Sequence, residues 1–389
     1  MMGVIDLTNR CNLKCPICYA NSNAAGYIYE PSYEQIVKMM LNLYNVKPIH
    51  APCIQFLGGE PTLHPQFLDI IREAKKIGFT QIQVATNGIT MAQGINSLSG
   101  EEFAKKASEA GLNFLYLQFD GVSDDVYLKI RGKPLLEIKK KAIENARKAG
   151  LRVVLVPTLT KNYNINQIGD IIKFAIDNLD VVSTVAFQPI ALTGRITNLE
   201  KNNLRFTITD LAREAEKQFP QVKMLDWYPF SFLSPFSKVF ELFLGQPKPR
   251  MTCHSHCGIA TALVINKEKT QIIPLPRFMD VVGIMTRMEE IYNEAQKKIF
   301  FKTLRSQANF SSYLKELEAF YFQDKAPGKL PLKELLPYFK SFANPKVFSD
   351  NQLKSEELKK RGYSILLLTV MHFQDAYNYE AERTQRCVV

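Results

Sequence analysis

Histidine, tryptophan and long apolar runs are scarce in this chain of 389 residues, which contains five His and one Trp. The longest largely apolar run, Ile365–Val370, is far below the roughly 20 residues that a membrane-spanning helix needs. The sequence shows no low-complexity tract, no repeat of fixed period and no secretory signal before its first motif. We therefore expect a cytoplasmic protein that touches a membrane, if at all, only at its surface.

Acidic residues are fewer than basic ones, so the formal net charge is +11. One interpretation is a solvated, lysine-rich surface, and the other is attraction to anions such as nucleotides or lipid headgroups. No run of Arg and Lys is dense enough to argue for nucleic acid, which we do not expect as a partner. Lys139, Lys140 and Lys141 are expected on an ordinary exposed helix face.

Short apolar strands alternate with helices through the first half of the chain. This alternation predicts a parallel sheet with right-handed crossovers, and six strands make a partial (β/α)6 barrel because a complete TIM barrel has eight. The expected strands are Val4–Leu7, Cys53–Leu57, Gln81–Ala85, Phe114–Phe119, Val153–Thr158 and Thr184–Gln188. The expected helices are Tyr33–Tyr44, Pro65–Ile77, Gly100–Ala110, Pro134–Ala149 and Ile165–Asn178.

The alternation stops after about Arg195. We expect a barrel core at residues 1–195, an aromatic-rich helical connection at 196–250, and a separate C-terminal α+β region at 251–389. That last region is expected to contain a hairpin at Ala262–Ile273 and to pack on the open side of the barrel. The first strand begins almost at residue 1 and Arg386–Val389 reads as a strand that stops, so we expect truncation at both ends.

Three of the seven cysteines form a C-x3-C-x2-C motif at Cys11, Cys15 and Cys18. The motif follows a strand, which places it in a loop at the C-terminal end of the sheet, where barrel active sites form. Three thiolates can hold three irons of a 4Fe–4S cluster and leave the fourth iron open to a small molecule. Zinc is the competing metal, but zinc sites usually complete four protein ligands.

At this motif the sequence resembles the radical S-adenosylmethionine (SAM) superfamily, whose cysteine loop binds such a cluster. The family usually has an aromatic residue where this chain has Ile17, and Tyr19 is expected to supply the missing ring. The resemblance implies a barrel whose cluster cleaves SAM to start radical chemistry. It covers roughly residues 4–190.

Further motifs of the resemblance recur at the ends of the predicted strands. Gly58, Gly59 and Glu60 match the family's GGE motif, which contacts the amino group of SAM, and the glycines would let the backbone approach a ligand. The remaining predicted cofactor-binding residues are Thr86 and Asn87 of a T-N-G segment, Asp120 of Q-F-D-G, Arg131 of I-R-G as a partner for an anion, and Gln188 beside the adenine.

A second cysteine pair, Cys253 and Cys257, flanks two histidines in a C-H-S-H-C segment. We expect an auxiliary 4Fe–4S cluster there, completed by Cys387 or by residues beyond the present end, with zinc as the alternative. Cys53 lies in a predicted strand and is expected to be an inert core thiol.

Aromatic residues are concentrated between Trp227 and Phe243. One interpretation is a core helix that covers the barrel, and the other is an apolar channel or membrane-interface patch for a long lipid chain. The substrate-binding residues of the second interpretation are Trp227, Phe230, Phe232, Phe236 and Phe240.

These features, together with Pro274–Phe278 and Met371–Asp375, resemble the archaeal tetraether-lipid synthases, earlier described as pterin methylases. The resemblance implies carbon–carbon coupling of lipid chain ends, with ferredoxin or flavodoxin as electron donor. A pterin methylase is the first alternative. A peptide-modifying enzyme would carry a denser cysteine pattern, and a non-catalytic iron–sulfur module would not need the SAM-site motifs.

Overall fold

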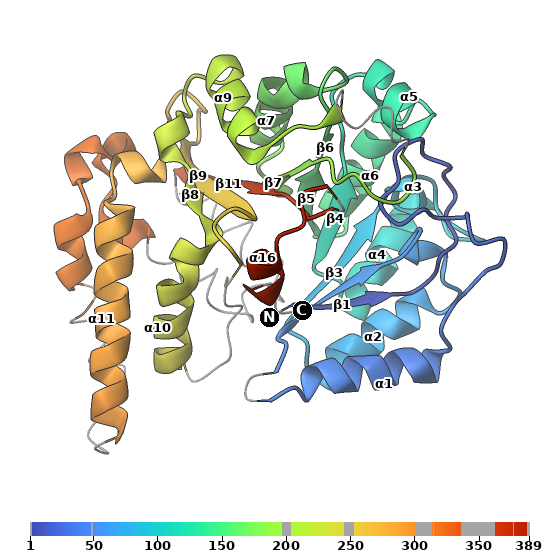
Figure 1. The fold of residues 1–389 in the computed structure, drawn as a ribbon, viewed down its shortest axis with the longest axis horizontal. Helices are drawn as coiled ribbons and strands as arrows, with labels where there is room; N and C mark the ends of the chain where they lie inside the picture. Colours follow the sequence, from blue (N-terminus) through green and yellow to red (C-terminus); the bar gives the residue numbers. More distant parts are fainter. Residues whose placement is uncertain are drawn as a thin grey trace.

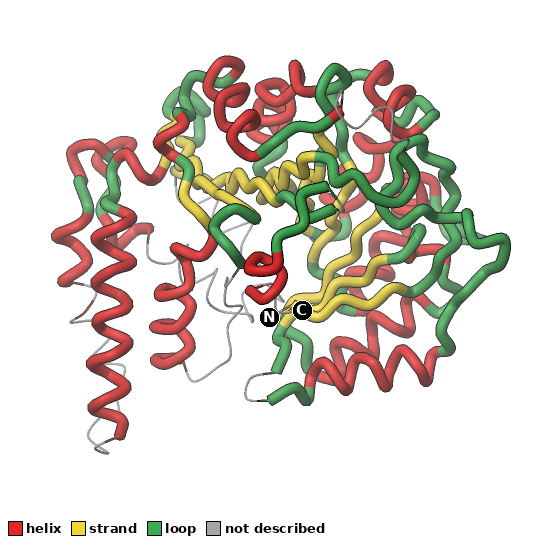
Figure 2. The backbone as a smooth tube through the Cα atoms, in the orientation of Figure 1, coloured by secondary structure: helices red, strands yellow, loops and turns green. Residues whose placement is uncertain are grey.

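The computed structural model describes residues 2–47, 50–196, 204–244, 253–300, 313, 315–335, 362–375 and 377–386. Its first half contains the predicted parallel strands, each hydrogen-bonded to the next. They are β1 (Met2–Asp6), β2 (Cys53–Leu57), β3 (Gln81–Thr86), β4 (Phe114–Gln118), β5 (Arg152–Val156) and β7 (Val182–Pro189). The strands curve in an arc with helices on the outer side, so the partial barrel that the sequence predicts is confirmed (Figures 1 and 2).

Helices cover the outer face of this sheet. Predicted helices appear as α1 (Tyr33–Tyr44), α2 (Phe67–Ile77), α4 (Gly100–Ala110), α6 (Leu136–Lys148) and α7 (Ile168–Asp177), with the short helices α3 (Ile89–Gln93) and α5 (Asp124–Arg131) in addition. Ser32 and Ser99 begin α1 and α4 with capping boxes, in which each serine accepts from a backbone N–H and the third helical residue bonds back.

Alternation along the strands separates two faces of the sheet. Residues such as Ile54, Leu115 and Val185 belong to the main core between sheet and helices. Their neighbours one position away face the inside of the barrel, where a smaller cluster contains Phe114, Val154 and Ala186. The predicted fifth strand is interrupted at Pro157, which lacks an N–H, and continues as the two-residue β6 (Thr158–Leu159) beside β7.

The C-terminal half continues the same sheet, whereas the sequence predicts a separate region. The strand β11 (Tyr363–Met371) lies parallel to β7, and β9 (Gly258–Asn266) lies antiparallel to β11. The predicted hairpin is present as β9 and β10 (Ile272–Pro274), and β8 (Tyr228–Pro229) also pairs with β9. The sequence missed this extension because nothing local in Ile365–Val370 specifies pairing with a strand so far away.

The remaining helices surround the extension. They are α9 (Ile208–Gln218), α10 (Ser234–Leu244), α11 (Val281–Phe300) and α16 (Ala381–Arg386), and a second hydrophobic core lies among α10, α11 and β9. Figure 1 shows α10 and α11 on the side away from β1, with α16 in front of the sheet. Among the described residues, no helix combines the length and apolar character needed to cross a membrane.

Candidate active site

The three N-terminal cysteines lie in the loop that follows β1, as the sequence predicts. Cys15 is buried with Leu13, Tyr127 and Leu135, while Cys11 and Cys18 are partly buried at the edge of this cluster. Backbone N–H groups of Leu13 and Ser22 lie 3.4 Å from the sulfurs of Cys11 and Cys18 respectively. N–H groups aimed at sulfur are typical of iron–sulfur sites.

Side chains from distant parts of the chain hold the backbone of this loop. Asn23 accepts from the N–H of Cys11 at 3.0 Å and donates to the carbonyls of Cys11 and Leu13 at 3.0 and 3.1 Å. Arg195 donates to the carbonyl of Cys15 at 2.8 Å, and Arg131 donates to that of Ile17 at 3.2 Å. The loop is therefore fixed before any ligand binds.

Burial raises the pKa of the Cys11 thiol to about 11. Burial also raises the pKa of Cys15, although the nearby Arg131 guanidinium opposes that rise. Because metals bind the thiolate, loading the site must release protons. A donor set of three sulfurs, two of them with N–H neighbours, fits iron–sulfur ligation.

Gly58 and Gly59 follow β2 and lie directly against the cysteine loop. A Cβ on Gly58, whose φ is +145°, would lie 2.4 Å from the carbonyl oxygen of Thr8, and one on Gly59 would lie 2.2 Å from that of Arg10. The N–H of Gly59 donates to Thr8 at 2.6 Å and that of Glu60 donates to Arg10 at 2.8 Å. The close approach that these glycines permit is between two loops of the chain, whereas the sequence suggested an approach to a ligand.

Glu60 is 0% exposed, and its carboxylate accepts several hydrogen bonds within the chain. The donors are the N–H and hydroxyl of Thr62 at 3.2 and 2.7 Å, the hydroxyl of Thr86 at 2.8 Å and the N–H of Asn87 at 2.8 Å. Burial raises the pKa of Glu60, and these bonds oppose the rise. Glu60 thus joins the β2 loop to the β3 loop, and its predicted contact with SAM stays a prediction.

Asp120 and Arg131 pair with each other, so within the chain the anionic partner of Arg131 is the Asp120 carboxylate. Arg131 donates two bonds of 2.7 Å to the Asp120 carboxylate, and both side chains are buried. Arg131 also donates to the Thr158 hydroxyl at 2.9 Å, while Asp120 accepts from the Thr158 N–H at 3.1 Å. A bidentate pair of this kind fixes the orientation of both side chains. Arg131 is therefore held in place where it donates its hydrogen bond to the cysteine loop.

Lys139 is fully buried, although the sequence places it on an exposed face. Its ammonium donates to the carbonyl of Asn87 and to Oε1 of Gln118 at 3.1 Å, and it lies 5.7 Å from the centre of the Tyr127 ring. The sequence carried a usable signal, because the buried Ala142, Ile143 and Ala146 lie three, four and seven positions after Lys139.

The inside of the barrel contains polar side chains beside the apolar cluster of Phe114, Val154 and Ala186. Gln55 of β2 accepts from Gln83 of β3, and Gln188 of β7 donates to the Tyr116 hydroxyl of β4 at 3.0 Å. Burial raises the pKa of Tyr116 to about 12. Of this group the sequence analysis named only Gln188. Strand alternation would have found the rest, because each is one position from a core residue.

Comparisons with known proteins bear on this barrel. Residues 5–175 match the family model described as the Radical SAM superfamily. The chain is also 40% identical to a protein of Methanocaldococcus jannaschii named 7,8-dihydro-6-hydroxymethylpterin dimethyltransferase, over 100% of this chain and 73% of that protein. The chain belongs to the radical SAM superfamily. It is therefore a radical SAM enzyme, and the cofactors of the family are a 4Fe–4S cluster and SAM.

Other relatives match about half of this chain. A probable GTP 3′,8-cyclase of Sulfurisphaera tokodaii is 27% identical over 48% of this chain and 56% of its own length. The Fe-coproporphyrin III synthase of Methanosarcina barkeri is 28% identical over 52% of this chain and 47% of its own. Among solved structures, Streptococcus suis SuiB bound to S-adenosylmethionine has a TM-score of 0.43 at 16% identity, covering 56% of this chain and 46% of SuiB.

The second cysteine pair of this radical SAM enzyme precedes β9. The carbonyl of Cys257 accepts from the N–H of His372 at 2.8 Å, and Nε of Arg383 in α16 lies 3.4 Å from the Cys257 sulfur. His254, His256 and Glu380 bring one ligand atom each within 4.8 Å of one another. Cys253 is partly buried, and Cys387 lies outside the described residues.

Tyr19 and Phe373 connect the two cysteine segments. Tyr19 follows Cys18, is 65% exposed, and its ring centre lies 6.0 Å from that of Phe373. Phe373 follows His372, whose N–H donates to Cys257. The Tyr19 ring thus lies against the segment that follows β11, and its predicted place beside the cluster stays a prediction.

The aromatic segment is largely buried. Trp227 lies in the main core and Phe230 is buried against Gly258, while Phe236 packs on the second core. Phe232 is partly buried with its ring centre 5.8 Å from that of Tyr228, and the side chain of Phe240 lies outside the described residues. These contacts match the interpretation as a helical cover, and substrate binding by this segment stays a prediction.

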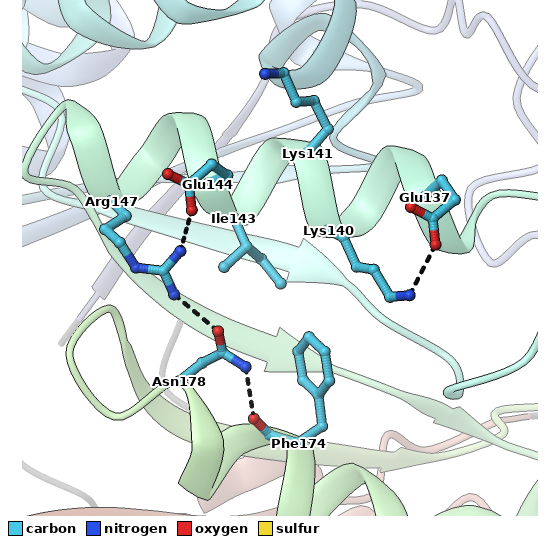
Figure 3. A pocket seen from close by; sticks show the side chains of 8 residues that line it. All are labelled: Glu137, Lys140, Lys141, Ile143, Glu144, Arg147, Phe174 and Asn178. Carbon is cyan, nitrogen blue, oxygen red and sulfur yellow. Dashed lines mark hydrogen bonds and ion pairs between the residues drawn. The ribbon is translucent and has the colours of Figure 1, made fainter.

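A surface pocket of about 420 Å³ lies between α6 and α7 (Figure 3). Its charged side chains pair with one another, as Lys140 does with Glu137 and Arg147 with Glu144. None of the predicted site residues lines it; the lining is Glu137, Lys140, Lys141, Ile143, Glu144, Arg147, Phe174 and Asn178. The pocket thus lies apart from the cysteine loop.

Proposed function

We propose that this radical SAM enzyme transfers methyl groups to a reduced pterin. The observation that carries the proposal is the 40% identity, over 100% of this chain, to the protein named 7,8-dihydro-6-hydroxymethylpterin dimethyltransferase. The relative's name gives the substrate class, and the interior of the barrel gives an independent physical reason to favour it.

The interior offers amide and phenol groups where a flat heterocycle would lie. Gln55, Gln83, Tyr116 and Gln188 are inward-facing and already exchange hydrogen bonds with one another. The pyrimidinone ring of a pterin carries N–H donors and carbonyl and ring-nitrogen acceptors, which match side-chain amides in both directions. An alkyl chain would offer nothing to the amide donors and acceptors that these hydrogen bonds leave unused, at a cost of about 1–3 kcal/mol for each group left unsatisfied.

The aromatic segment gives the lipid-coupling interpretation less support than its sequence suggested. Trp227 and Phe230 are buried, and Phe232 and Phe236 are partly buried. The expectation of peripheral membrane contact depends on the +11 charge alone.

The chain's own residues divide the work as follows in this proposal. Cys11, Cys15 and Cys18 would hold the cluster, which when bound and reduced would supply the electron for cleavage of SAM. A separate methyl donor, such as a second molecule of SAM, would supply the methyl group. The backbone of Gly58 and Gly59 and the side chain of Asn87 border the methionine end of SAM. The inward amides orient the pterin, and ferredoxin or flavodoxin is the proposed electron donor.

Cys253 and Cys257 form a second iron–sulfur site in this proposal. The ring contact between Tyr19 and Phe373 supports a position of that site on the side of the cysteine loop, from which it could exchange electrons with the radical centre. Cys387 or a residue beyond the present end completes its ligand set.

The deciding assay incubates the reconstituted enzyme, SAM and reductant with either a reduced hydroxymethylpterin or an archaeal diether lipid. The expected result is pterin-dependent formation of 5′-deoxyadenosine and of a methylated pterin, identified by mass spectrometry. Coupled lipid without methylated pterin would replace this proposal with the lipid-coupling interpretation.

A variant pair tests the location of the pterin. Gln188→Leu should raise the KM for the pterin more than the KM for SAM, whose adenine is also expected beside Gln188. Gln66→Leu, on the exposed start of α2, is the matched control and should match the wild type. An unchanged pterin KM in Gln188→Leu would place the substrate elsewhere.

A further inference from the structure

Lys139 occupies a position where a charged group is costly. It lies in the first turn of α6 on the buried face, is 0% exposed, and its neighbour Lys140 has a side chain that is 46% exposed. Burying an ammonium group takes several kcal/mol unless charge or hydrogen bonds compensate. Its presence therefore calls for a role that a hydrophobic residue would not fill.

The hydrogen bonds of Lys139 join two strand ends beneath the cysteine loop. The acceptors are the carbonyl of Asn87, after β3, and Oε1 of Gln118, at the end of β4. Both acceptors are neutral, and within the described ranges Lys139 has no ion-pair partner within 4.0 Å. The positive charge of Lys139 is thus not neutralised by a carboxylate in direct contact with it.

The buried charges around the loop balance only if Lys139 is included. Asp120 is neutralised by Arg131 through two bonds of 2.7 Å, whereas every hydrogen bond to the carboxylate of Glu60 comes from a neutral donor in the described part of the chain. Glu60, Asp120, Arg131 and Cys15 all lie within electrostatic reach of the Lys139 ammonium. Without Lys139 the set would carry an uncompensated negative charge next to three thiolates.

Tyr127 places this charge close to the cysteines. The Lys139 ammonium lies 5.7 Å from the centre of the Tyr127 ring. Tyr127 in turn belongs to the same buried cluster as Cys15. Cys15 and Lys139 influence each other electrostatically, and between buried groups a unit charge is screened much less than in water. The net charge around an iron–sulfur cluster is one of the quantities that set its reduction potential.

We propose that Lys139 is a positioning residue whose buried positive charge raises the reduction potential of the cluster on the cysteine loop. This inference rests on the proposed assignment of the cluster to Cys11, Cys15 and Cys18. Adding an electron makes the cluster more negative, and a fixed cation nearby stabilises that state. Lys139 thereby makes the electron that begins SAM cleavage easier to deliver.

The test compares Lys139→Gln, which keeps a hydrogen-bond donor without the charge, with Lys140→Gln as the control on the exposed face. Iron and sulfide per chain and the midpoint potential, followed anaerobically by electron paramagnetic resonance, are measured for each. We expect a more negative potential in Lys139→Gln at full cluster content, and the wild-type potential in Lys140→Gln. An unchanged potential in a fully loaded Lys139→Gln would overturn the proposal.

A second measurement tests the proposal even if Lys139→Gln does not retain its cluster. Burial lowers the pKa of Lys139 to about 8, so the wild-type potential should fall as pH rises from 7 to 10 and the ammonium loses its proton. Lys139→Arg cannot lose its charge in this range and should show a flatter profile. A wild-type potential that does not change with pH would contradict the proposal.

Failure of the cluster assignment would look different. If Cys15→Ala keeps the electron paramagnetic resonance signal attributed to the SAM cluster, the assignment itself is wrong, whatever Lys139 does. If that signal is lost in Cys15→Ala and the potential is the same in fully loaded wild type and Lys139→Gln, only the role of Lys139 is wrong.

Discussion

The two cysteine segments of this enzyme are held by different parts of the fold. Around Cys11, Cys15 and Cys18, the loop backbone is bound by Asn23 of the same loop and by Arg131 and Arg195, which follow later barrel strands. Around Cys257 the contacts come from the last described residues, through His372 and Arg383. The first segment is thus preorganised by the barrel, whereas the second is assembled only when β11 and α16 are in place.

The largest expected effect is a loss of activity from a substitution in the first cysteine segment. Cys15→Ala should abolish 5′-deoxyadenosine formation under anaerobic reduction, because one of the three cluster ligands is lost. Cys53→Ala, which removes a buried thiol of β2, is the matched control and should retain product. Undiminished product in Cys15→Ala would remove the radical centre from this loop.

Cys253→Ala is expected to remove the metal of the second cysteine segment only. Iron and sulfide per chain should fall by one cluster, while 5′-deoxyadenosine formation persists. His256→Ala serves as comparison, because His254, His256 and Glu380 offer ligands for a single ion instead. Unchanged iron in Cys253→Ala, with metal lost in His256→Ala, would replace the second cluster with a mononuclear site.

The buried ion pair tests whether the barrel network supports the first segment. Asp120→Ala leaves Arg131 charged, buried and unpaired, so the free energy of unfolding should fall by about 3–5 kcal/mol in urea. The double variant Asp120→Ala/Arg131→Met should recover part of this loss. Asp69→Ala breaks an exposed pair with Arg72 and should change stability little. Equal effects of the two single variants would show that the network adds nothing.

The smallest expected effect is a change of unfolding free energy with pH, caused by Lys139 near the first cysteine segment. The folded pKa of Lys139 is about 8, below its ordinary value, so between about pH 8 and 10.5 the unfolded chain binds more protons. Stability should therefore rise with pH in this window, by about 1–3 kcal/mol relative to Lys139→Met. The measurement is the difference in unfolding free energy between the two proteins at each pH. A difference that stays constant with pH would mean that Lys139 does not titrate there.

The local pattern was enough to predict the six barrel strands and the cysteine loop. It was not enough where a side chain's partner is distant in sequence. Arg131 was expected to partner an anion, but nothing in I-R-G reveals that Asp120 folds back onto it. Gly58 and Gly59 were recognised as sites of close approach, but the approaching group, the backbone at Thr8 and Arg10, comes from another loop.

The prediction that Lys139 is exposed was wrong for a different reason. Its helical spacing from Ala142, Ile143 and Ala146 placed it on the buried face, yet residue type outweighed position because lysine is rarely buried. The inward amides were missed for a similar reason, since glutamine in a strand looks solvent-facing until the strand closes into a barrel. In both cases the polar residue inside an apolar pattern was the informative one.

The pairing of β7 with β11 also affects how the protein is made. The hydroxyl of Thr369 in β11 bonds to the carbonyl of Val185 in β7 across 184 residues of sequence. At translation rates of about 5–20 residues per second, β7 emerges from the ribosome roughly 10–40 s before its neighbour. Throughout that interval the nascent sheet exposes an unpaired strand edge, which is a template for aggregation. We therefore expect the yield of folded protein to depend on chaperones that shield this edge until β11 has been synthesised.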